Sequence, residues 1–478
     1  MTSLKLLTVS TLALTLMSCS TTINIDTKEG IQVTHSRMSS VSGNPEIKML
    51  SNMALEGHYG YEITKSLTTE VGARQAGSPQ EAQARLWAVK KFEALGFENI
   101  TTEAFTIDGW KRGVETVTLI APSSQKLFVT ALGGSVATPD AGIEAPVAFF
   151  STFDDLKNAP ENSLDGKIVY ISGLMERTLN GAGYGPANMK RRSGATEAAK
   201  RGALAVLIRS VGTDSHRFPH TGQMAYDPDI KKIPIGAISG PDADQLDRIF
   251  ASGEDVVINM RLQTWATGTQ TSGNVMGEIV GSEKPEEIIV IGAHLDSWDL
   301  GTGAIDDGAG VGIVMGAAKV LMESGLKPKR TIRVVLFGSE EIGIKGGIAY
   351  VKAHKDTDLA NHVLATESDF GADRIYGLQT GLTDANKAAV RAMAHEFEFL
   401  GIELLDGEST GGPDVGPLSR AGVPTIRLNQ DGTDYFDLHH TPDDTFDKID
   451  PEAMAQNVAA YATLIWLASE SNSNFKDN

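Results

Sequence analysis

Acidic and imidazole side chains occur close together at five places in the second half of the sequence. These places are His294-Leu295-Asp296, Asp306-Asp307, Glu340-Glu341, Glu367-Ser368-Asp369 and His439-His440. Imidazole nitrogen and carboxylate oxygen, without a thiolate, form a donor set that suits zinc, with manganese or cobalt as substitutes. Such a set can carry out metal-assisted hydrolysis, because a bound divalent cation lowers the pKa of water.

Four of these places follow segments that the sequence predicts to be buried β-strands. The predicted strands are residues 288–291, 332–337, 363–365 and 425–428, which are compact apolar runs. Helix-like segments lie between or after them, at residues 309–323, 346–353, 384–400 and 451–468, and Asp306-Asp307 begins the first of these. In open α/β sheets ligands bind beyond the carboxyl ends of the strands, so we expect all five places to meet at one edge.

Each place taken alone has an ordinary structural explanation. His294-Leu295-Asp296 could be a surface hydrogen-bonded pair, Asp306-Asp307 could cap a helix, and Glu340-Glu341 could lie in a solvated loop. His439-His440 could be a pair in the core or on the surface. Together these explanations require five coincidences of position, so we favour a joint metal site.

The charges of the candidate ligands indicate how many metal ions they can hold. Asp306, Glu341 and Asp369 supply three negative charges, while His294 and His440 bind as neutral imidazoles. Two divalent ions leave a net charge of one, which a bridging hydroxide brings to zero. Five ligands with one shared carboxylate suit two ions about 3.5–4 Å apart. We therefore predict two zinc ions per chain.

The order and spacing of these motifs resemble those of the zinc-dependent aminopeptidase and glutamate carboxypeptidase family, the two-zinc exopeptidases. The motifs are His294-Leu295-Asp296, Gly303-Ala304-Ile305-Asp306-Asp307-Gly308, Ser339-Glu340-Glu341-Ile342-Gly343, Asp369 and His440-Thr441-Pro442-Asp443-Asp444-Thr445. The stretch from Glu197 to Val211, followed by Pro219-His220-Thr221-Gly222, is similar to a carboxypeptidase branch of that family. The likeness covers residues 50–470.

The resemblance implies a role for each of these residues. His294 and Asp369 would hold one zinc, Glu341 and His440 the other, and Asp306 would bridge the two. Glu340 would be the general base, which takes a proton from the metal-bound water and delivers it to the leaving amine. Asp296 and Asp444 would accept hydrogen bonds from His294 and His440 and fix their tautomers.

One position departs from the pattern of several aminopeptidases, which place a tyrosine just before the last histidine ligand. Here that position is His439, as in the carboxypeptidase branch. A hydroxyl at this place can stabilise the developing oxyanion. Either His439 takes over this donor role or Tyr435 reaches in, and we favour His439.

The predicted function is that of a two-zinc metallo-exopeptidase that hydrolyses dipeptides or the N-terminal residues of short peptides. A glutaminyl cyclase-like acyltransferase on the same fold, or a non-catalytic receptor-like relative, is the alternative. Retention of all five ligands and Glu340 favours hydrolysis. The cluster Lys190-Arg191-Arg192 could bind a substrate carboxylate, but we expect it to be a solvated loop.

Two other hydrolase signatures are excluded by their neighbours. Gly407-Glu408-Ser409-Thr410-Gly411 fits the pattern of a serine nucleophile elbow, but Gly411-Gly412-Pro413 prevents the helix that must follow. His395-Glu396 is followed by Phe397-Glu398-Phe399, so a His-Glu-x-x-His zinc site is absent from the sequence.

The predicted fold is α/β, with a mixed, largely parallel sheet flanked by helices, as in zinc exopeptidases of the phosphorylase/hydrolase-like fold. Residues 43–134 and 267–470 would form the catalytic domain, with a smaller β-rich, protease-associated-like domain inserted at residues 135–266. Residues 51–95 show a helical pattern, and the small polar segment 267–273 reads as the exit from the insert. Residues 471–478 are expected to be a disordered tail.

The N-terminus has the features of an export signal. Lys5 precedes an apolar run, residues 6–17, that is too short to span a bilayer, and Cys19 follows a small residue as in a bacterial lipobox. We predict a signal peptide at residues 1–18, lipidation of Cys19 and a flexible tether at residues 19–42. The protein would be lipid-anchored on the periplasmic side of the outer membrane, or secreted.

Composition narrows the range of partners. The 42 basic and 61 acidic residues give a formal net charge of −19, which disfavours nucleic-acid binding. A single cysteine excludes an intrachain disulfide and a thiolate zinc cluster. We expect a short peptide as substrate and membrane contact only through the lipid anchor. A homodimer is expected from the resemblance alone.

Overall fold

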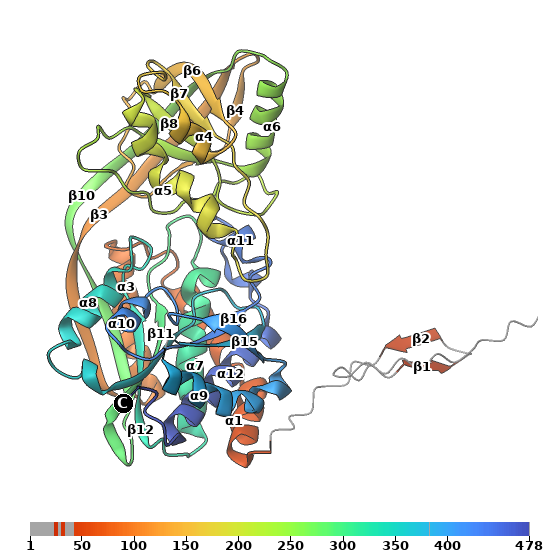
Figure 1. Ribbon diagram of the computed structural model, residues 1–478, viewed down its shortest axis with the longest axis vertical. Coiled ribbons are helices and arrows are strands. Elements are labelled where there is room, and N and C mark those ends of the chain that lie inside the picture. The colour runs from red at the N-terminus through yellow and green to blue at the C-terminus, as the bar shows by residue number, and fades with distance from the viewer. Residues whose placement is uncertain (1–22, 27–29, 34–42, 382, 478) are drawn as a thin grey trace, which may run out of the picture.

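The computed structural model describes residues 23–26, 30–33, 43–381 and 383–477. The predicted signal peptide and Cys19 lie outside these residues. Within the predicted tether, β1 (Ile23–Asp26) pairs antiparallel with β2 (Gly30–Val33). From residue 43 onward the chain forms a main lobe and a smaller inserted lobe, stacked along the long axis of the molecule (Figure 1).

The main lobe is built on a mixed sheet in the order β13 (His362–Glu367), β11 (Lys284–His294), β12 (Arg330–Phe337) and β10 (Val257–Ile279). β11 runs parallel to both β12 and β13, while β10 pairs antiparallel with β12. Every residue of β12 and β13 is buried, which explains why apolar residues occur consecutively in both strands, as in Val334–Phe337 and Val363–Ala365. The predicted α/β class with a mixed sheet and flanking helices is confirmed.

Helices cover both faces of this sheet. On one face, Ile289 and Ile291 of β11 share a core with α7 (Ala309–Glu323) and α12 (Pro451–Glu470). On the other face, Ile288 and Val290 pack in a separate core that includes Tyr350 of α8 (Lys345–His354). Since successive side chains of a strand point to opposite faces, both faces of β11 are apolar.

Further elements complete the main lobe. The N-terminal helices are α1 (Pro45–Gly57), α2 (Tyr59–Glu70) and α3 (Pro79–Leu95), so the helical pattern of residues 51–95 is divided among three helices. A small sheet has the order β15 (Glu403–Glu408), β14 (Ile375–Thr380), β16 (Ile426–Gln430). The remaining helices are α9 (Asp384–Ala394), α10 (Gly416–Arg420) and α11 (Tyr435–Leu438), with short 3-10 segments at Leu359–Asn361, His395–Leu400 and Phe446–Lys448.

The inserted lobe contains a parallel run of β6 (Ile143–Phe150), β7 (Ile168–Ile171), β8 (Ala205–Arg209) and β9 (Ile235–Ile238), with β5 (Val129–Ala131) antiparallel at its edge. Its helices are α4 (Phe153–Asn158), α5 (Tyr184–Lys200) and α6 (Gly240–Ala251). β4 (Gln125–Leu127) pairs with β3 (Glu98–Ala121).

Two long strands join the lobes. β3 and β10 pair antiparallel over most of their length and run from one lobe into the other (Figure 1). The segment 267–273, expected to be the exit from the insert, lies inside β10, and its residues 268–273 pair with residues 104–109 of β3, so the chain leaves the inserted lobe as a continuous strand. Pairing along β3 satisfies its backbone groups, and small polar side chains do not prevent this.

The chain end also differs from expectation. Residues 471–477 pack on the main lobe instead of forming a disordered tail, since Phe475 is fully buried and Arg330 donates hydrogen bonds to the carbonyls of Ser471 (2.7 Å) and Ser473 (2.9 Å). Among the described residues, no helix has the length and apolar character needed to cross a membrane.

Candidate metal centre

The five predicted places do meet at one edge of the main sheet. His294 is the last residue of β11, and Glu340-Glu341 follows β12 after two residues. Asp369 lies two residues beyond β13, and Asp306 lies in the turn Ala304–Gly308 that leads into α7. His439-His440 directly follows α11. Their common position follows from the parallel direction of β11, β12 and β13.

Asp306 occupies the centre of the cluster. Its Oδ1 lies 2.9 Å from His294 Nε2, and its Oδ2 lies 3.2 Å from His440 Nε2. The two oxygens of one buried carboxylate thus face two different imidazoles. This is the geometry expected of a carboxylate that bridges two cations.

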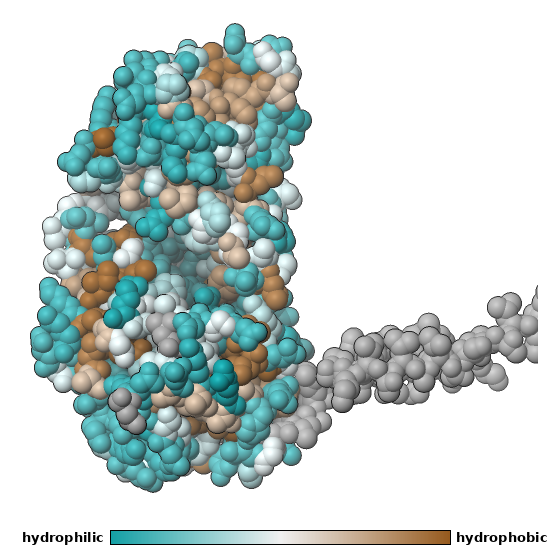
Figure 2. Space-filling view, viewed as in Figure 1, coloured by the Kyte–Doolittle hydropathy of each residue, from teal (hydrophilic) through white to brown (hydrophobic). Residues whose placement is uncertain are grey.

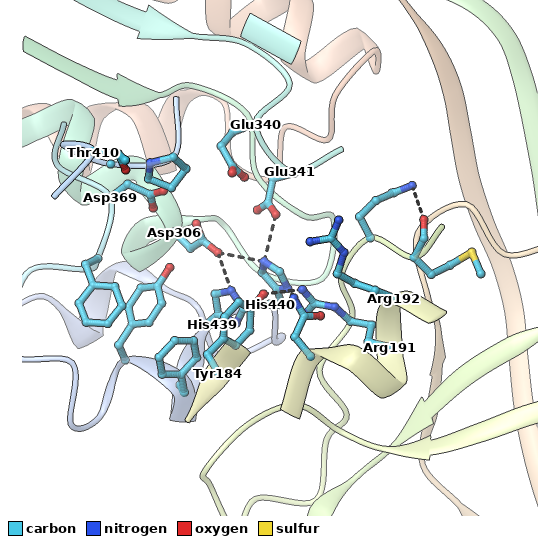
Figure 3. A pocket seen from close by; sticks show the side chains of 18 of the residues that line it. Tyr184, Arg191, Arg192, Asp306, Glu340, Glu341, Asp369, Thr410, His439 and His440 are labelled. Carbon is cyan, nitrogen blue, oxygen red and sulfur yellow. Dashed lines mark hydrogen bonds and ion pairs between the residues drawn. The ribbon is translucent and has the colours of Figure 1, made fainter. Parts of the chain in front are cut away.

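The other two predicted ligands lie on opposite sides of Asp306. Glu341 Oε2 is 3.0 Å from His440 Nε2, while Asp369 Oδ1 is 3.6 Å from His294 Nε2. The distances therefore group His294 with Asp369 and Glu341 with His440, with Asp306 in contact with both imidazoles. Figure 3 shows Asp369 and Glu341 on either side of Asp306. Donor atoms of His294, Asp306 and Glu341 also lie within 4.8 Å of one another, close enough to surround an ion.

The backbone around the cluster is constrained. Ser339, directly before the glutamate pair, has φ 61°, and His440 has φ 63°, both in the left-handed region that non-glycine residues rarely adopt. Strained residues persist where the surrounding structure holds them, and they gather at functional sites.

Polar groups behind the ligands fix their orientation. His294 Nδ1 lies 2.9 Å from the backbone carbonyl of Asp296, and its backbone N–H donates to Asp307 Oδ2 at 3.0 Å. The Asp296 carboxylate lies 3.7 Å from His294 Nδ1 and accepts instead from the N–H of Glu340 at 3.0 Å. Asp296 thus links the two ligand loops, and its carbonyl rather than its carboxylate orients the ring of His294.

The role predicted for Asp444 requires correction. Its carboxylate does not contact His440, but accepts hydrogen bonds from the backbone N–H groups of Ile305 (2.6 Å) and Asp306 (3.3 Å). Asp444 therefore holds the turn that carries Asp306. His440 Nδ1 faces the carbonyl of Thr221 at 3.3 Å, so its partner comes from the inserted lobe.

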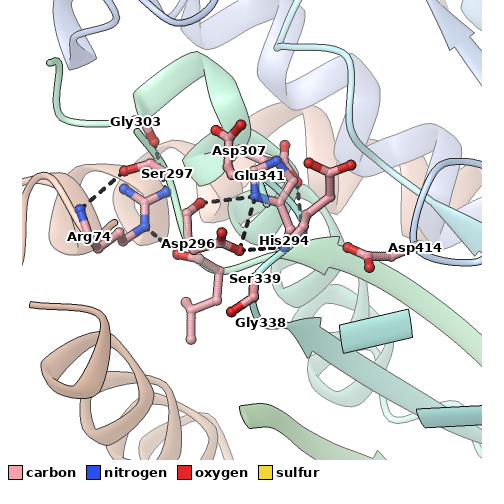
Figure 4. A network of polar contacts seen from close by, with 12 residues as sticks. Arg74, His294, Asp296, Ser297, Gly303, Asp307, Gly338, Ser339, Glu341 and Asp414 are labelled. Carbon is pink, nitrogen blue, oxygen red and sulfur yellow. Dashed lines mark hydrogen bonds and ion pairs between the residues drawn. The ribbon is translucent and has the colours of Figure 1, made fainter. Parts of the chain in front are cut away.

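A buried arginine that sequence reasoning missed supports the same turn. Arg74 is fully buried and donates to the carbonyls of Leu295, Thr302 (2.7 Å) and Gly303 (2.9 Å) (Figure 4). These hydrogen bonds bind the loop between β11 and Asp306 from behind. A lone arginine between two helices gives no sequence signal for this role, because its burial depends on the tertiary packing.

The acids of the cluster are electrostatically unfavourable without a cation. Burial raises the pKa of Glu340 well above its usual range, and the carboxylates of Asp369 and Glu341 add to the shift. Burial, followed by the charge of Asp306, raises the pKa of Glu341. Burial also acts to raise the pKa of Asp306, but hydrogen bonds to His294 and His440 hold it well below its usual range. A divalent cation would allow all these carboxylates to ionise together.

The two candidates for oxyanion donor both line the cavity above the cluster. His439 is stacked on His440 with ring centroids 3.4 Å apart, and its Nε2 lies 3.7 Å from Asp306 Oδ2. Burial and the neighbouring His440 lower the pKa of His439, which keeps its ring neutral. Tyr435 reaches the same cavity and stacks on Phe370. Asp306, His439 and His440 also form a possible three-ligand group.

The cavity lies between the two lobes and has a volume of about 510 Å³. The space-filling view shows the surface hollowed at this level (Figure 2). One wall comes from α5 of the inserted lobe, with Tyr184, Arg191 and Arg192. The expected solvated loop at Lys190-Arg191-Arg192 is therefore wrong: the three residues lie on a helix, and Lys190 and Arg191 are buried.

Comparison with known proteins places this site in a family. The sequence profile of peptidase family M28 matches residues 274–465. Carboxypeptidase Q of the mouse (Mus musculus) is 33% identical over 428 residues, which cover 88% of this chain and 89% of that protein. The chain belongs to peptidase family M28. The predicted resemblance to zinc-dependent aminopeptidases and carboxypeptidases, and to carboxypeptidase Q among them, is confirmed.

Other relatives agree with this assignment. Carboxypeptidase Q of Xenopus laevis is 35% identical, with 88% of this chain and 89% of that protein covered. A peptidase M28 precursor from Shewanella amazonensis has a solved structure with TM-score 0.87 and 47% identity, covering 89% of this chain and 96% of that one. A zinc aminopeptidase of Bacillus subtilis shares the fold at TM-score 0.61 and 22% identity, covering 85% and 93% of the two chains. The M28 protein described here is a metallopeptidase.

Proposed function

We propose that this metallopeptidase is a two-zinc exopeptidase that cleaves dipeptides or the N-terminal residues of short peptides. The observation that carries the proposal is the position of Asp306, whose two oxygens lie 2.9 Å and 3.2 Å from the Nε2 atoms of His294 and His440. A single carboxylate between two imidazoles serves two cations, and each imidazole has its own acid beside it.

The donor set fits zinc. Imidazole nitrogens and carboxylate oxygens, without thiolate, are borderline ligands that zinc accepts, with manganese or cobalt as substitutes. Glu341 Oε1 and His439 Nδ1 are buried without a hydrogen-bond partner among the described residues. A bound cation would give such a buried oxygen the partner that it lacks. His294 and Asp369 would hold one ion, Glu341 and His440 the other, with Asp306 shared. When bound, the ions supply Lewis acidity and lower the pKa of water.

Glu340 is proposed as the general base. It lines the cavity beside Glu341 and is held in place by its backbone N–H, which donates to Asp296 Oδ1 at 3.0 Å. In this position the carboxylate takes a proton from the attacking water and passes it to the leaving amine. A carboxylate within hydrogen-bond reach of the attacking water can accept its proton as a general base.

The shape of the site favours short substrates. The cavity of about 510 Å³ has the acids of the main lobe at its base and α5 of the inserted lobe as a wall. His439 and Tyr435 line the cavity, and a neutral N–H or a hydroxyl can stabilise the oxyanion that develops from the scissile carbonyl. We propose His439 for this role.

The alternatives make different demands on the site. A glutaminyl cyclase-like acyltransferase would need one ion, whereas all five ligand side chains and Glu340 are gathered here. A non-catalytic receptor-like relative would have no requirement for a buried acid at Glu340. Neither alternative accounts for the two-sided arrangement about Asp306.

Two substitutions test the proposed function. Glu340→Gln should keep two zinc ions per chain in elemental analysis but lower kcat by about 10²–10⁴-fold, because only the proton transfer is removed. Asp306→Ala should lose both metal and activity. The control is Glu62→Gln, which changes an exposed carboxylate of α2. Near-normal dipeptide hydrolysis by either site variant, or a single ion in the parent protein, would refute the proposal.

Export and assembly remain proposals of their own. We propose that cleavage before Cys19 leaves a lipidated N-terminus on the periplasmic side of the outer membrane, and that the enzyme is a homodimer. Mass spectrometry of the mature N-terminus and sedimentation of the purified protein test these two points. An unmodified Cys19 or a monomer would overturn them.

A further inference from the structure

The cavity over the metal centre combines acidic and basic walls. Its base carries Asp306, Glu340, Glu341 and Asp369, and guanidinium groups line its sides. These come from Arg191 and Arg192 on α5 and from Arg427 on β16. Such an arrangement is complementary to a small zwitterion. To bind the carboxylate of that zwitterion, an arginine must not already be paired with another group of the protein.

Arg191 is already committed to the protein. It is 5% exposed, and its Nη1 lies 3.4 Å from both the carbonyl of Thr221 and His440 Nδ1. Its Nη2 donates to the hydroxyl of Tyr184. Arg191 therefore supports His440, and both of its terminal nitrogens already face protein groups.

Arg427 is partly committed. It is half-buried, and its guanidinium lies over the ring of Phe370, 5.6 Å from the centroid. A cation held against an aromatic face is stabilised without a carboxylate. Arg427 and Phe370 both line the cavity.

Arg192 has no such partner. Its guanidinium makes no hydrogen bond or ion pair with any residue in the described part of the chain, although it lines the cavity. Figure 3 shows its side chain reaching from α5 into the cavity on the side of Glu341 and His440. Its backbone is fixed, since its carbonyl accepts a hydrogen bond from Ala225 at 3.1 Å.

The wall that carries Arg192 is fastened to the metal centre. Thr221 donates its backbone N–H to the carbonyl of His440 at 3.0 Å, and His220 Nδ1 lies 2.7 Å from the carbonyl of His439. The other ring nitrogen of His220 contacts Asp214 Oδ1 at 2.6 Å. These contacts fix the backbone of the inserted lobe against the segment that carries His439 and His440, so the base of the exposed Arg192 side chain keeps its position beside the cavity.

We propose that Arg192 binds the C-terminal carboxylate of the substrate, and so makes this enzyme select peptides that end one residue after the scissile bond. The inference rests on the proposed peptidase function and names the group that limits substrate length. One residue spans about 3.5 Å, so the carboxylate of a dipeptide stays close to the bond that is cut. A planar guanidinium pairs with such a carboxylate through two parallel hydrogen bonds. In a longer peptide a neutral amide replaces the carboxylate, and this pairing is lost.

The test compares a dipeptide with its C-terminal amide, using the full-length zinc-loaded enzyme. The parent enzyme should cleave the free acid with a kcat/KM about 10–100-fold higher than that for the amide, the range expected for a hydrogen-bonded charge. Arg192→Gln should raise KM for the acid by a similar factor and leave the amide unchanged. Lys200→Gln, at the far end of α5 and paired with Glu197 at 3.0 Å, is the control and should change neither.

Binding separates this inference from the proposed function. Calorimetric titration of the Glu340→Gln variant with the same two ligands should show the acid binding about 10–100-fold more tightly, and added Arg192→Gln should abolish the difference. If the parent enzyme cleaves neither ligand but this binding difference holds, the peptidase proposal fails and the carboxylate site stands. Equal binding of acid and amide, or loss of the preference in Arg427→Gln instead of Arg192→Gln, overturns the assignment of Arg192.

Discussion

At the scale of single residues, the most informative feature is the number of buried carboxylates around the glutamate pair Glu340-Glu341, which have few cationic side chains beside them. A chain of hydroxyl contacts runs behind the glutamate pair: Ser339 Oγ lies 2.8 Å from Ser272 Oγ, which donates to Glu81 Oε1 at 3.1 Å. Glu81 is fully buried. Burial raises its pKa to about 7, against the opposing effect of Arg85. The loop that carries Glu340 is therefore connected, through Ser339 and Ser272, to a carboxyl group whose pKa lies near neutral pH.

This shift predicts a pH dependence of stability. The ordinary pKa of Glu81 is 4.5 and the folded value is about 7, so its protonated form is favoured in the folded state. Its contribution is fully present below pH 4.5 and is lost as the pH rises through about 7, by about 3 kcal/mol of unfolding free energy. Glu81→Gln should remove that loss.

Urea unfolding at pH 5 and pH 8, in the presence of a chelator, measures this effect. The difference between the two pH values should shrink in Glu81→Gln by about 2.5 kcal/mol, relative to the parent protein. The exposed Glu62→Gln variant controls for the loss of a carboxylate. An identical pH dependence in the parent and in Glu81→Gln would show that Glu81 does not titrate in this range.

At the scale of elements, the close contact between α2 and α7 positions the turn that carries Asp306. A Cβ added to Gly312 of α7 would lie 2.2 Å from Thr64 Oγ1 and 2.5 Å from the carbonyl of Gly60, both in α2. Thr64 Oγ1 also donates to the carbonyl of Gly308, at the start of α7, at 2.9 Å. Displacing α7 would therefore also displace the metal-binding turn.

Gly312→Ala should destabilise the fold by about 1–3 kcal/mol through overpacking, and it should weaken zinc binding. Gly185→Ala, in α5, is the matched helical control, because nothing lies within 4 Å of an added Cβ there. Alanine at that position should be neutral or stabilising by up to about 1 kcal/mol. Denaturant midpoints and zinc titrations of both variants measure the contrast, and equal midpoints would show that α2 and α7 can separate without cost.

At the scale of the whole molecule, metal binding should stabilise the folded chain. The proposed ligands lie at the end of β11, after β12 and β13, in the turn before α7 and in the segment after α11, so they assemble only in the folded state. Free zinc at 1,000 times its Kd adds about 4 kcal/mol to the free energy of unfolding.

Chelation should therefore lower Tm, and added zinc should restore it in a concentration-dependent manner. Calorimetric scans with and without chelator measure the shift. The Asp306→Ala variant should show a low Tm that chelation does not change. A parent protein whose Tm is insensitive to zinc would contradict a metal centre that depends on the fold.

Much of the fold and of the site could be predicted from local pattern. Apolar runs predicted β11, β12 and β13, and residues 309–323 form a helix with the predicted bounds. The acids and histidines that follow these runs do meet, because parallel strands place their carboxyl ends at one edge. These inferences needed only the neighbouring residues and one rule of topology.

Partners distant in sequence could not be predicted in this way. Segment 267–273 is a strand because β3 pairs with it, and Asp444 holds the turn of Asp306 instead of the ring of His440. Burial of Arg74 and the unpaired state of Arg192 likewise depend on which surfaces meet after folding.

The sequence by itself thus determined the residue types of the candidate ligands, their order along the chain and the sheet edge at which they lie. Only the tertiary structure decided that Asp306 faces both His294 and His440, and that α5 supplies a cationic wall from another lobe. The physical reason is the distance along the chain over which each property is set. Periodicity and strand direction are properties of short segments, whereas the charge and hydrogen-bond partners of a side chain are set by whatever packs against it.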